Sequence, residues 1–133
     1  LGKFHPIKHS ALAEDIDKDF PFLLTTGRNL YHYHITMTAK TKGLNELAGS
    51  PYIEINPNDA LKYGIKDHDL IYVYSRRGAI TVPAKIVDTI KEGVVFIPLH
   101  YVQAPVNVIT SDAFDRYTKT PAFKVCAVGI KKV

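Results

Sequence analysis

Apolar and polar residues alternate with a period of two along several short segments of this chain, which is the pattern of half-buried β-strands. The predicted strands, in chain order, are residues 20–26, 52–55, 70–75, 79–87, 94–99 and 123–130. Turn-forming sequences, rather than long amphipathic helices, separate them. About six strands without a strand–helix–strand rhythm predict a mostly-β domain, namely a barrel with short helical insertions.

Helical signals are confined to two short segments. Asn56 suits an N-cap, Pro57 suits the first helical position and Gly64 suits a C-terminal stop, which together predict a short helix. A single helical turn is expected at 44–48. Pro83 has no backbone N–H to donate, so it favours an edge or a bulge within its predicted strand.

Two irregular stretches bear on how the chain is organised. Residues 1–19 are polar and aperiodic and are expected to form a surface lead-in or linker. Residues 20–133 are expected to form one barrel domain. Residues 27–43 lack a clean period and predict a long loop, of the kind that is often functional in a compact domain.

Composition narrows the class of protein. The net charge of +4 suits an anionic partner, but the basic residues are scattered rather than striped, so nucleic-acid binding is not predicted. No apolar run reaches the roughly 20 residues of a membrane span and no secretory leader is seen, so a cytoplasmic location is expected. The single cysteine, Cys126, excludes an intrachain disulfide and a multi-cysteine zinc site. Its apolar surroundings predict a buried structural thiol.

Ligand-binding chemistry is concentrated where the first predicted strand ends, in Thr25-Thr26-Gly27-Arg28. Gly27 permits a turn or the close approach of a ligand to the backbone. Arg28 presents a planar fork to a phosphate or to the edge of a heterocycle, and a surface salt bridge is the alternative. No glycine-rich phosphate loop or dinucleotide fingerprint is present, so a standard nucleotide fold is disfavoured.

Three histidines and two later residues supply the other candidates. His32 and His34 point the same way if the backbone is extended. Such a pair binds zinc only with further ligands such as His100, so hydrogen bonding to a polar ligand is favoured. Asn107 follows in a loop and is either a ligand contact or a turn residue. Lys124, in the last predicted strand, is either an edge-strand gatekeeper or an anion contact.

In order and spacing, these motifs resemble the C-terminal molybdopterin-dinucleotide-binding domain of the molybdenum and tungsten oxidoreductases. The strongest resemblance is to the catalytic (alpha) subunit of formate dehydrogenases, and it covers nearly the whole chain. It begins in the lead-in, at Gly2–Pro6. The further motifs that carry it are Phe20–Arg28, Leu30–His34, Thr36–Thr38, Gly43–Leu47, Asn58–Ala60, Tyr63–Ile65, Asp69, Ser75–Gly78, Asn107 and Phe123–Val128.

This resemblance implies a double-psi β-barrel that packs over a bis-molybdopterin guanine dinucleotide cofactor. By their place in the motifs, the cofactor-side candidates are Thr26, Gly27, Arg28, His32, His34, Thr38, His100, Asn107 and Lys124. The edges of a pterin pair with such side chains and with backbone groups, and pyrophosphates attract cations and N–H donors. The cofactor's dithiolenes hold the molybdenum or tungsten, so no metal-ligating residue is expected here.

The resemblance also implies what lies outside this chain. The selenocysteine or cysteine that binds the metal, and the iron–sulfur cluster motif, belong to an earlier domain, so no catalytic residue is expected and the isolated domain should be inactive. The implied enzyme oxidises formate to carbon dioxide with a two-electron transfer. Its implied partners are the remaining domains of the catalytic subunit and electron-transfer subunits. Two alternatives are a separate small barrel subunit, as in formylmethanofuran dehydrogenase, and a barrel that has lost its cofactor and serves as an interaction module.

Overall fold

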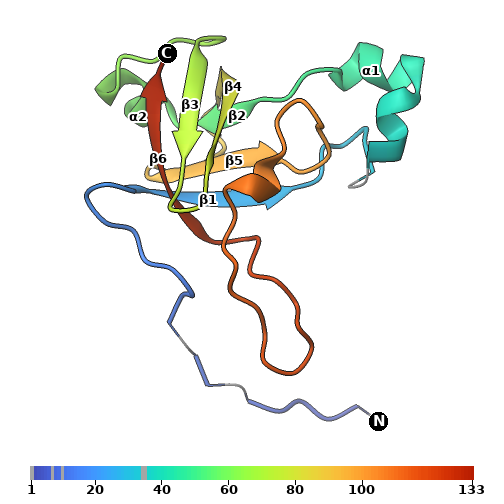
Figure 1. Ribbon diagram of the computed structural model, residues 1–133, viewed down its shortest axis with the longest axis vertical. Coiled ribbons are helices and arrows are strands. Elements are labelled where there is room, and N and C mark those ends of the chain that lie inside the picture. The colour runs from blue at the N-terminus through green and yellow to red at the C-terminus, as the bar shows by residue number, and fades with distance from the viewer. Residues whose placement is uncertain (1, 7, 10, 34–35) are drawn as a thin grey trace.

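Six strands close into a barrel in the computed structural model, which describes residues 2–6, 8, 9, 11–33 and 36–133 (Figure 1). In chain order they are β1 (Phe22–Gly27), β2 (Ile53–Ile55), β3 (Leu70–Tyr74), β4 (Ala79–Ile86), β5 (Val94–Pro98) and β6 (Cys126–Lys132). Around the barrel they run β1-β5-β2-β4-β3-β6 and back to β1. The prediction of a mostly-β barrel with short helical insertions is therefore confirmed.

Two pairs of consecutive strands are each separated by an inserted strand. β1 and β2 are antiparallel, and β5 lies between them, parallel to β1 and antiparallel to β2. β4 and β5 likewise enclose β2, which is parallel to β4. Two interlocked motifs of this kind make the fold a double-psi β-barrel, as the resemblance implied. Their crossing connections bring loops from distant parts of the chain to the same strand ends.

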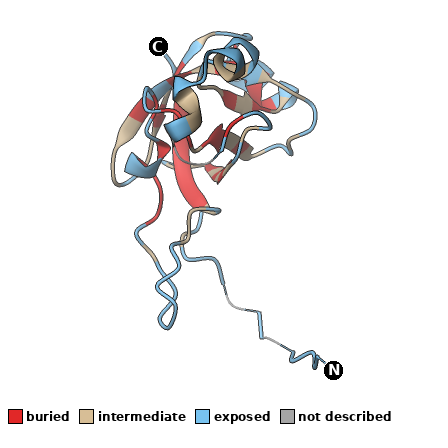
Figure 2. Ribbon diagram, turned by 90° about the vertical axis from the view of Figure 1, so that its right-hand side faces the viewer, coloured by how far each residue is buried: buried red, intermediate tan, exposed pale blue. Residues whose placement is uncertain are grey.

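The barrel interior is filled by the inward-facing residues of the alternating strands. Leu24 of β1, Ile53 and Ile55 of β2, and Val95 and Ile97 of β5 have no exposed surface. Figure 2 shows these buried stretches gathered in the barrel, with exposed loops around them. Each such side chain stabilises the fold by about 1.5–3 kcal/mol relative to its exposed state. The strands are therefore a firm frame from which the loops project.

Short helices occupy the connections between strands. They are η1 (Thr36–Lys40), α1 (Lys42–Ala48), α2 (Pro57–Lys62) and η2 (Val106–Val108). The side chain of Asn56 accepts a hydrogen bond from the Asn58 N–H at 2.9 Å, as expected of the N-cap of α2. Gly64 follows the helix with a φ of 64°, the left-handed conformation that glycine adopts easily. The predicted start and stop of this helix are confirmed.

The prediction of an irregular loop over residues 27–43 is only partly correct. Its second half contains η1 and the start of α1, which begins at Lys42 rather than at residue 44. The side-chain amide of Asn45 donates to the Ala39 carbonyl at 2.6 Å and ties α1 to η1. Hydrophobic periodicity carries no signal for a side-chain contact of this kind.

The last strand also differs from its predicted bounds, because β6 begins at Cys126 rather than at residue 123. Phe123 and Lys124 form a turn before it. Lys124 is therefore not in a strand, and its interpretation as an edge-strand gatekeeper is wrong. Pro83 is likewise not at an edge: β4 pairs with β3 up to Pro83 and with β2 from Ala84 onward, so the proline lies where the strand changes partner.

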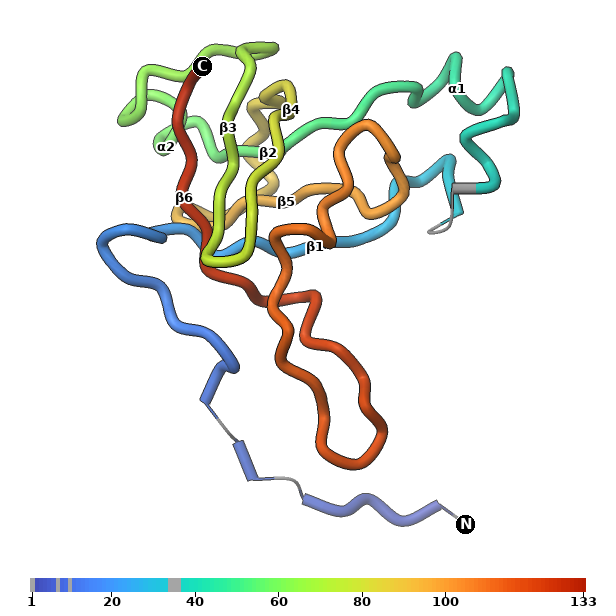
Figure 3. Tube along the Cα trace, in the orientation of Figure 1, coloured from blue at the N-terminus to red at the C-terminus, as the bar shows by residue number. Residues whose placement is uncertain are grey.

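Two segments project from the same side of the barrel (Figure 3). One is an arm, residues 111–122, closed by an isolated bridge between Phe114 and Pro121. The other is the lead-in, whose described residues before β1 contain neither helix nor strand. Its separation from the barrel domain at residue 20 stays a prediction. Within the described residues, no helix has the length and apolar character that crossing a membrane requires.

Candidate functional site

Thr26 and Gly27 end β1 in a tightly packed junction. Thr26 is 2% exposed, and its Oγ1 donates to the Phe123 carbonyl at 2.8 Å. Lys124 extends its Nζ to the Thr26 carbonyl. A Cβ at Gly27 would lie 2.8 Å from Cε2 of Phe96, so only glycine allows the backbone to pass this ring undisturbed. The structure therefore brings Thr26, Gly27 and Lys124 together, and the Thr26 hydroxyl holds the turn before β6.

Arg28 follows directly and is exposed. Its guanidinium carbon lies 6.0 Å from the centre of the Tyr33 ring, and residues 28–33 line a pocket of about 430 Å³. Among the described residues, no carboxylate forms an ion pair with Arg28, so the salt-bridge alternative finds no support there. A cation beside an aromatic ring in an open pocket is suited to an anionic or planar ligand.

His32 is buried and both of its ring nitrogens have partners. Nε2 lies 2.8 Å from the Ala48 carbonyl and must donate to it, so the other nitrogen is an acceptor in the neutral ring. That nitrogen, Nδ1, lies 3.1 Å from Oγ1 of Thr38, which also accepts from the Tyr33 N–H at 3.2 Å. His32 and Thr38 thus contact each other, in a network that ties the loop after β1 to the end of α1.

His100 stacks on His32 but differs from it in hydrogen bonding. Its side chain is 2% exposed, yet neither ring nitrogen has a hydrogen-bond partner among the described residues. Burial, and then the neighbouring His32, lower the pKa of His100, which keeps the ring neutral. Buried polar nitrogens normally have partners, so this ring is suited to a hydrogen-bonding group from outside the chain.

Tyr101 completes the histidine cluster, although the sequence analysis did not select it. Its hydroxyl donates to the Ala48 carbonyl at 2.7 Å and accepts from the Asn29 side chain at 3.3 Å. Burial is the main reason that the pKa of Tyr101 is raised, so the hydroxyl remains a donor at neutral pH. In the sequence, only its position directly after His100 pointed to Tyr101.

No group of three or more His, Cys, Asp or Glu side chains within the described part of the chain is arranged to hold a metal ion.

Asn107 lies apart from these residues, in a second pocket. It is exposed on η2, and its carbonyl accepts from Oγ1 of Thr110 at 3.1 Å. The pocket, of about 480 Å³, is mainly apolar and is lined by Asn107, Arg77, Phe114 and Phe123 among others. It shares no lining residue with the pocket at Arg28. The remaining candidate, His34, lies outside the described residues.

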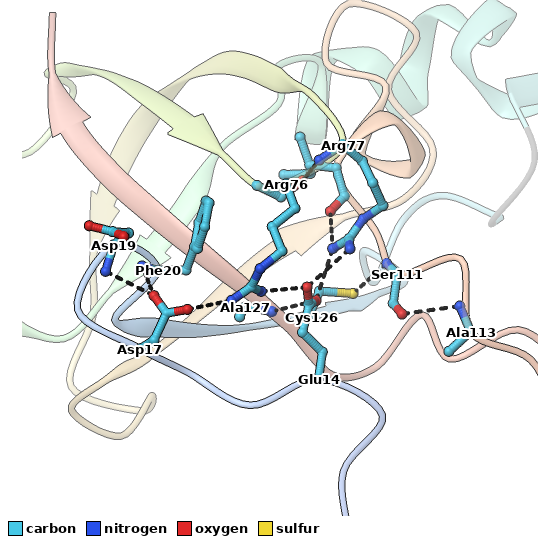
Figure 4. Close-up of polar contacts among 12 residues, drawn as sticks. Glu14, Asp17, Asp19, Phe20, Arg76, Arg77, Ser111, Ala113, Cys126 and Ala127 are labelled. Carbon is cyan, nitrogen blue, oxygen red and sulfur yellow. Dashed lines mark hydrogen bonds and ion pairs between the residues drawn. The ribbon is translucent and has the colours of Figure 1, made fainter.

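Arg77 and Glu14 are the main residues that the sequence analysis missed. Arg77 donates from Nη1 and Nη2 to the two carboxylate oxygens of Glu14, at 3.0 and 2.9 Å. Burial alone would raise the pKa of Glu14, but hydrogen bonds from Arg77, the Ala127 N–H and Arg76 lower it to about 2. Figure 4 shows the lead-in held against the barrel by these contacts. Glu14 and Arg77 are 63 residues apart, and Glu14 lies in an irregular segment, so no local sequence pattern predicts their contact.

Cys126 is fully buried, as predicted, and its Sγ accepts from the Ser111 N–H at 3.0 Å. Burial is the main reason that the pKa of its thiol is raised, so the thiolate is disfavoured. The prediction of a buried structural thiol is confirmed.

The chain is similar to parts of much longer proteins. It is 50% identical over 133 residues to the "F420-dependent formate dehydrogenase subunit alpha" of Methanocaldococcus jannaschii, a match that covers 99% of this chain and 20% of that protein. It is 38% identical over 129 residues to the "Nitrate reductase" of Symbiobacterium thermophilum, covering 93% of this chain and 17% of that protein. The chain thus spans about a fifth of the length of these curated relatives.

A solved structure has the same fold. Acetylene hydratase from Pelobacter acetylenicus matches 87% of this chain and 19% of its own, with a TM-score of 0.75 and 17% identity. At that identity the likeness is one of fold alone. The model of the "Molydopterin dinucleotide binding domain" family matches residues 22–127, which include the whole barrel as far as the start of β6. The chain therefore belongs to the molydopterin dinucleotide binding domain family.

Proposed function

We propose that this chain binds a bis-molybdopterin guanine dinucleotide cofactor as the C-terminal domain of a formate dehydrogenase-like molybdenum or tungsten oxidoreductase. The observation that carries the proposal is the 50% identity, over essentially the whole chain, to a protein described as a formate dehydrogenase alpha subunit. The family match to a molydopterin dinucleotide binding domain supports the cofactor class.

The described residues fit such a group. Arg28 is an exposed cation without an ion-pair partner among them, and Lys124 is an exposed cation beside the end of β1. Cations of this kind suit the pyrophosphate of a dinucleotide. The ring nitrogens of His100 suit the amide-like edges of a pterin, because they offer a donor and an acceptor that no described residue uses.

In this proposal the chain binds and orients, and other domains supply the catalytic residue. Arg28 and Lys124 offset negative charge, Asn107 offers a side-chain amide, and His32 holds the His100 ring in its place by stacking and by its own two hydrogen bonds. The bound metal and its dithiolenes supply the two-electron chemistry. The apolar pocket lining around Asn107 and Phe123 excludes water from whatever part of the cofactor it covers.

The proposed partners follow from this role. They are the remaining domains of the catalytic subunit, an iron–sulfur cluster held by an earlier domain, and electron-transfer subunits in the cytoplasm. The domain alone would bind cofactor without turning over formate. A separate small barrel subunit, as in formylmethanofuran dehydrogenase, is the alternative arrangement, and it would bind the cofactor with the same residues.

Cofactor retention in the intact subunit tests the proposal. We expect Arg28→Gln to lower the pterin content of purified subunit by about tenfold, because a charge-assisted contact contributes about 1.5–3 kcal/mol. Pterin is measured by its fluorescence after denaturation and oxidation. Lys91→Gln, which removes an equal charge from an exposed turn elsewhere, is the matched control. Equal pterin content in both variants would refute a cofactor contact at Arg28.

Nitrate reduction is a second candidate for the whole enzyme. The 38% identity to a protein described as a nitrate reductase favours it, since the same domain family serves that activity as well. Assaying the intact subunit with formate and an acceptor dye, and separately with nitrate and a reduced dye, distinguishes the two. We expect turnover with formate; turnover with nitrate alone would assign the chain to the second candidate.

A further inference from the structure

The lead-in is clamped to the barrel by a cluster of charges, here called the Glu14 clasp and consisting of Glu14, Asp17, Arg76 and Arg77 (Figure 4). Arg77 forms the bidentate pair with Glu14 described above, and Nη1 of Arg76 donates to the same carboxylate at 2.6 Å. Asp17 forms an ion pair with Arg76. Two arginines of one turn are thus held by two carboxylates of the lead-in.

Burial makes this clasp stronger than an ordinary surface ion pair. The Glu14 side chain is 10% exposed and that of Arg77 is 22% exposed. Glu14 Oε2 also accepts from the Ala127 N–H of β6 at 3.0 Å, so the carboxylate joins the lead-in, the β3–β4 turn and β6. Bidentate, charge-assisted hydrogen bonds are the strong class and fix geometry as well as charge.

Arg77 carries the constraint onward to the loop that contains Asn107. Its Nη2 also donates to the Ile109 carbonyl at 3.3 Å, directly after η2. The same turn presses on η2 at Gly78, where a Cβ would lie 2.6 Å from Cγ1 and 3.1 Å from the carbonyl oxygen of Val108. A shift of this turn must therefore move η2, since no free space separates them.

We infer that Glu14 is a positioning residue for Asn107. It acts through Arg77, which lines the same pocket as Asn107 and bonds the loop two residues beyond it. The lead-in therefore helps to position a residue of the site and is more than a linker. The coupling between Glu14 and η2 stands on geometry alone, whereas its consequence for cofactor binding rests on the proposed function.

The coupling is tested by nitrogen-15 NMR on the full 133-residue chain, without cofactor. We expect Glu14→Gln and Arg77→Lys each to shift the side-chain amide signal of Asn107 and the backbone amides of 106–110. We also expect these amides to exchange with solvent about tenfold faster, because one charge-assisted contact to a buried partner is lost. Combining both substitutions should produce little further shift, since each already breaks the same pair.

Asp15→Asn is the matched control, because it removes an equal charge from an exposed neighbour of Glu14. Circular dichroism confirms folding of each variant, and Arg77→Lys serves if Glu14→Gln does not fold. Unchanged Asn107 signals in a folded Glu14→Gln chain, or equal shifts in Asp15→Asn, would overturn the inference. A second measurement, the pterin content of intact subunit carrying Glu14→Gln or Asn107→Ala, isolates the proposed function: shifted signals with unchanged pterin content support the positioning and refute the role of Asn107.

Discussion

The rings of His32 and His100 stack with their centres 4.0 Å apart and their planes 22° from parallel. The two side chains are chemically identical and almost equally buried. Both ring nitrogens of His32 have hydrogen-bond partners, whereas neither ring nitrogen of His100 has one among the residues that the structure describes. This contrast separates His32, which supports the local structure, from His100, which the proposed function assigns to ligand binding.

Exchanging each histidine for phenylalanine should separate these two roles. We expect His100→Phe to change the free energy of unfolding by less than about 1 kcal/mol, because the stack is kept and no hydrogen bond to a described residue is lost. His32→Phe should cost about 1–3 kcal/mol, since it removes two hydrogen bonds. Urea denaturation measures both. Pterin content of the intact subunit should fall in His100→Phe, and an equal stability loss in the two variants would contradict the distinction.

Acid should weaken the fold through Glu14. The folded-state pKa of Glu14, about 2, lies below the ordinary glutamate value of 4.5, so the carboxylate stabilises the fold fully above pH 4.5 and loses this contribution as the pH falls toward 2. The lowering of the Glu14 pKa corresponds to at most about 3–4 kcal/mol. The hydrogen bond to Glu14 is the main reason that the pKa of Arg77 is raised, so Arg77 stays charged throughout this range.

Urea unfolding measured between pH 6 and pH 2.5 checks this dependence. Glu14→Gln should flatten the profile in the acid range, whereas Asp15→Asn should leave its shape as in the unaltered chain. A Glu14→Gln profile as steep as that of the unaltered chain would assign the acid sensitivity to other carboxylates.

Gly27→Ala should destabilise the end of β1 by about 1–3 kcal/mol, because the added Cβ would lie 2.8 Å from the Phe96 ring. Phe96→Leu shortens the obstructing side chain, so in combination with Gly27→Ala it should recover part of the lost stability. Thermal unfolding of the two single variants and the double variant measures this coupling. Simple additivity of the two single effects would mean that the ring is not the obstacle.

Thr26→Val should cost about 1 kcal/mol, because it keeps the shape of the side chain but leaves the Phe123 carbonyl without its 2.8 Å donor. Thr26→Ser keeps the hydroxyl and should cost less. Urea denaturation compares the two variants. The amide signals of 123–125 should shift in Thr26→Val only, and the reverse order of stability would show that the methyl group, not the hydroxyl, matters here.

Several local features of this chain followed from local sequence. The cap at Asn56, the stop at Gly64 and the alternation of β1 each depend on neighbours a few residues away, and all three occur as predicted. The start of β6 did not follow, because Phe123 and Lys124 continue the apolar alternation but are held in a turn by contacts with Thr26.

The candidate site, too, was predicted from the sequence only in part. Sequence motifs identified Thr26, Gly27, Arg28, His32 and His100 as a group, and their order along the chain supported one family. No motif indicated that Thr38 and Ala48 pair with both ring nitrogens of His32, whereas no described residue pairs with those of His100. Hydrogen-bond partners depend on distances in the folded structure, and residue order alone does not give those distances.

The sequence by itself determined the strand periods, the caps, the family and the kinds of side chain available for binding, because each of these depends on residue type and short-range spacing. Tertiary structure decided which of those side chains form hydrogen bonds within the chain. It also placed Glu14 in contact with Arg77, which in turn bonds the residue after η2. The physical reason is closure of the double-psi barrel, whose crossing strands bring segments distant in the chain within hydrogen-bond reach.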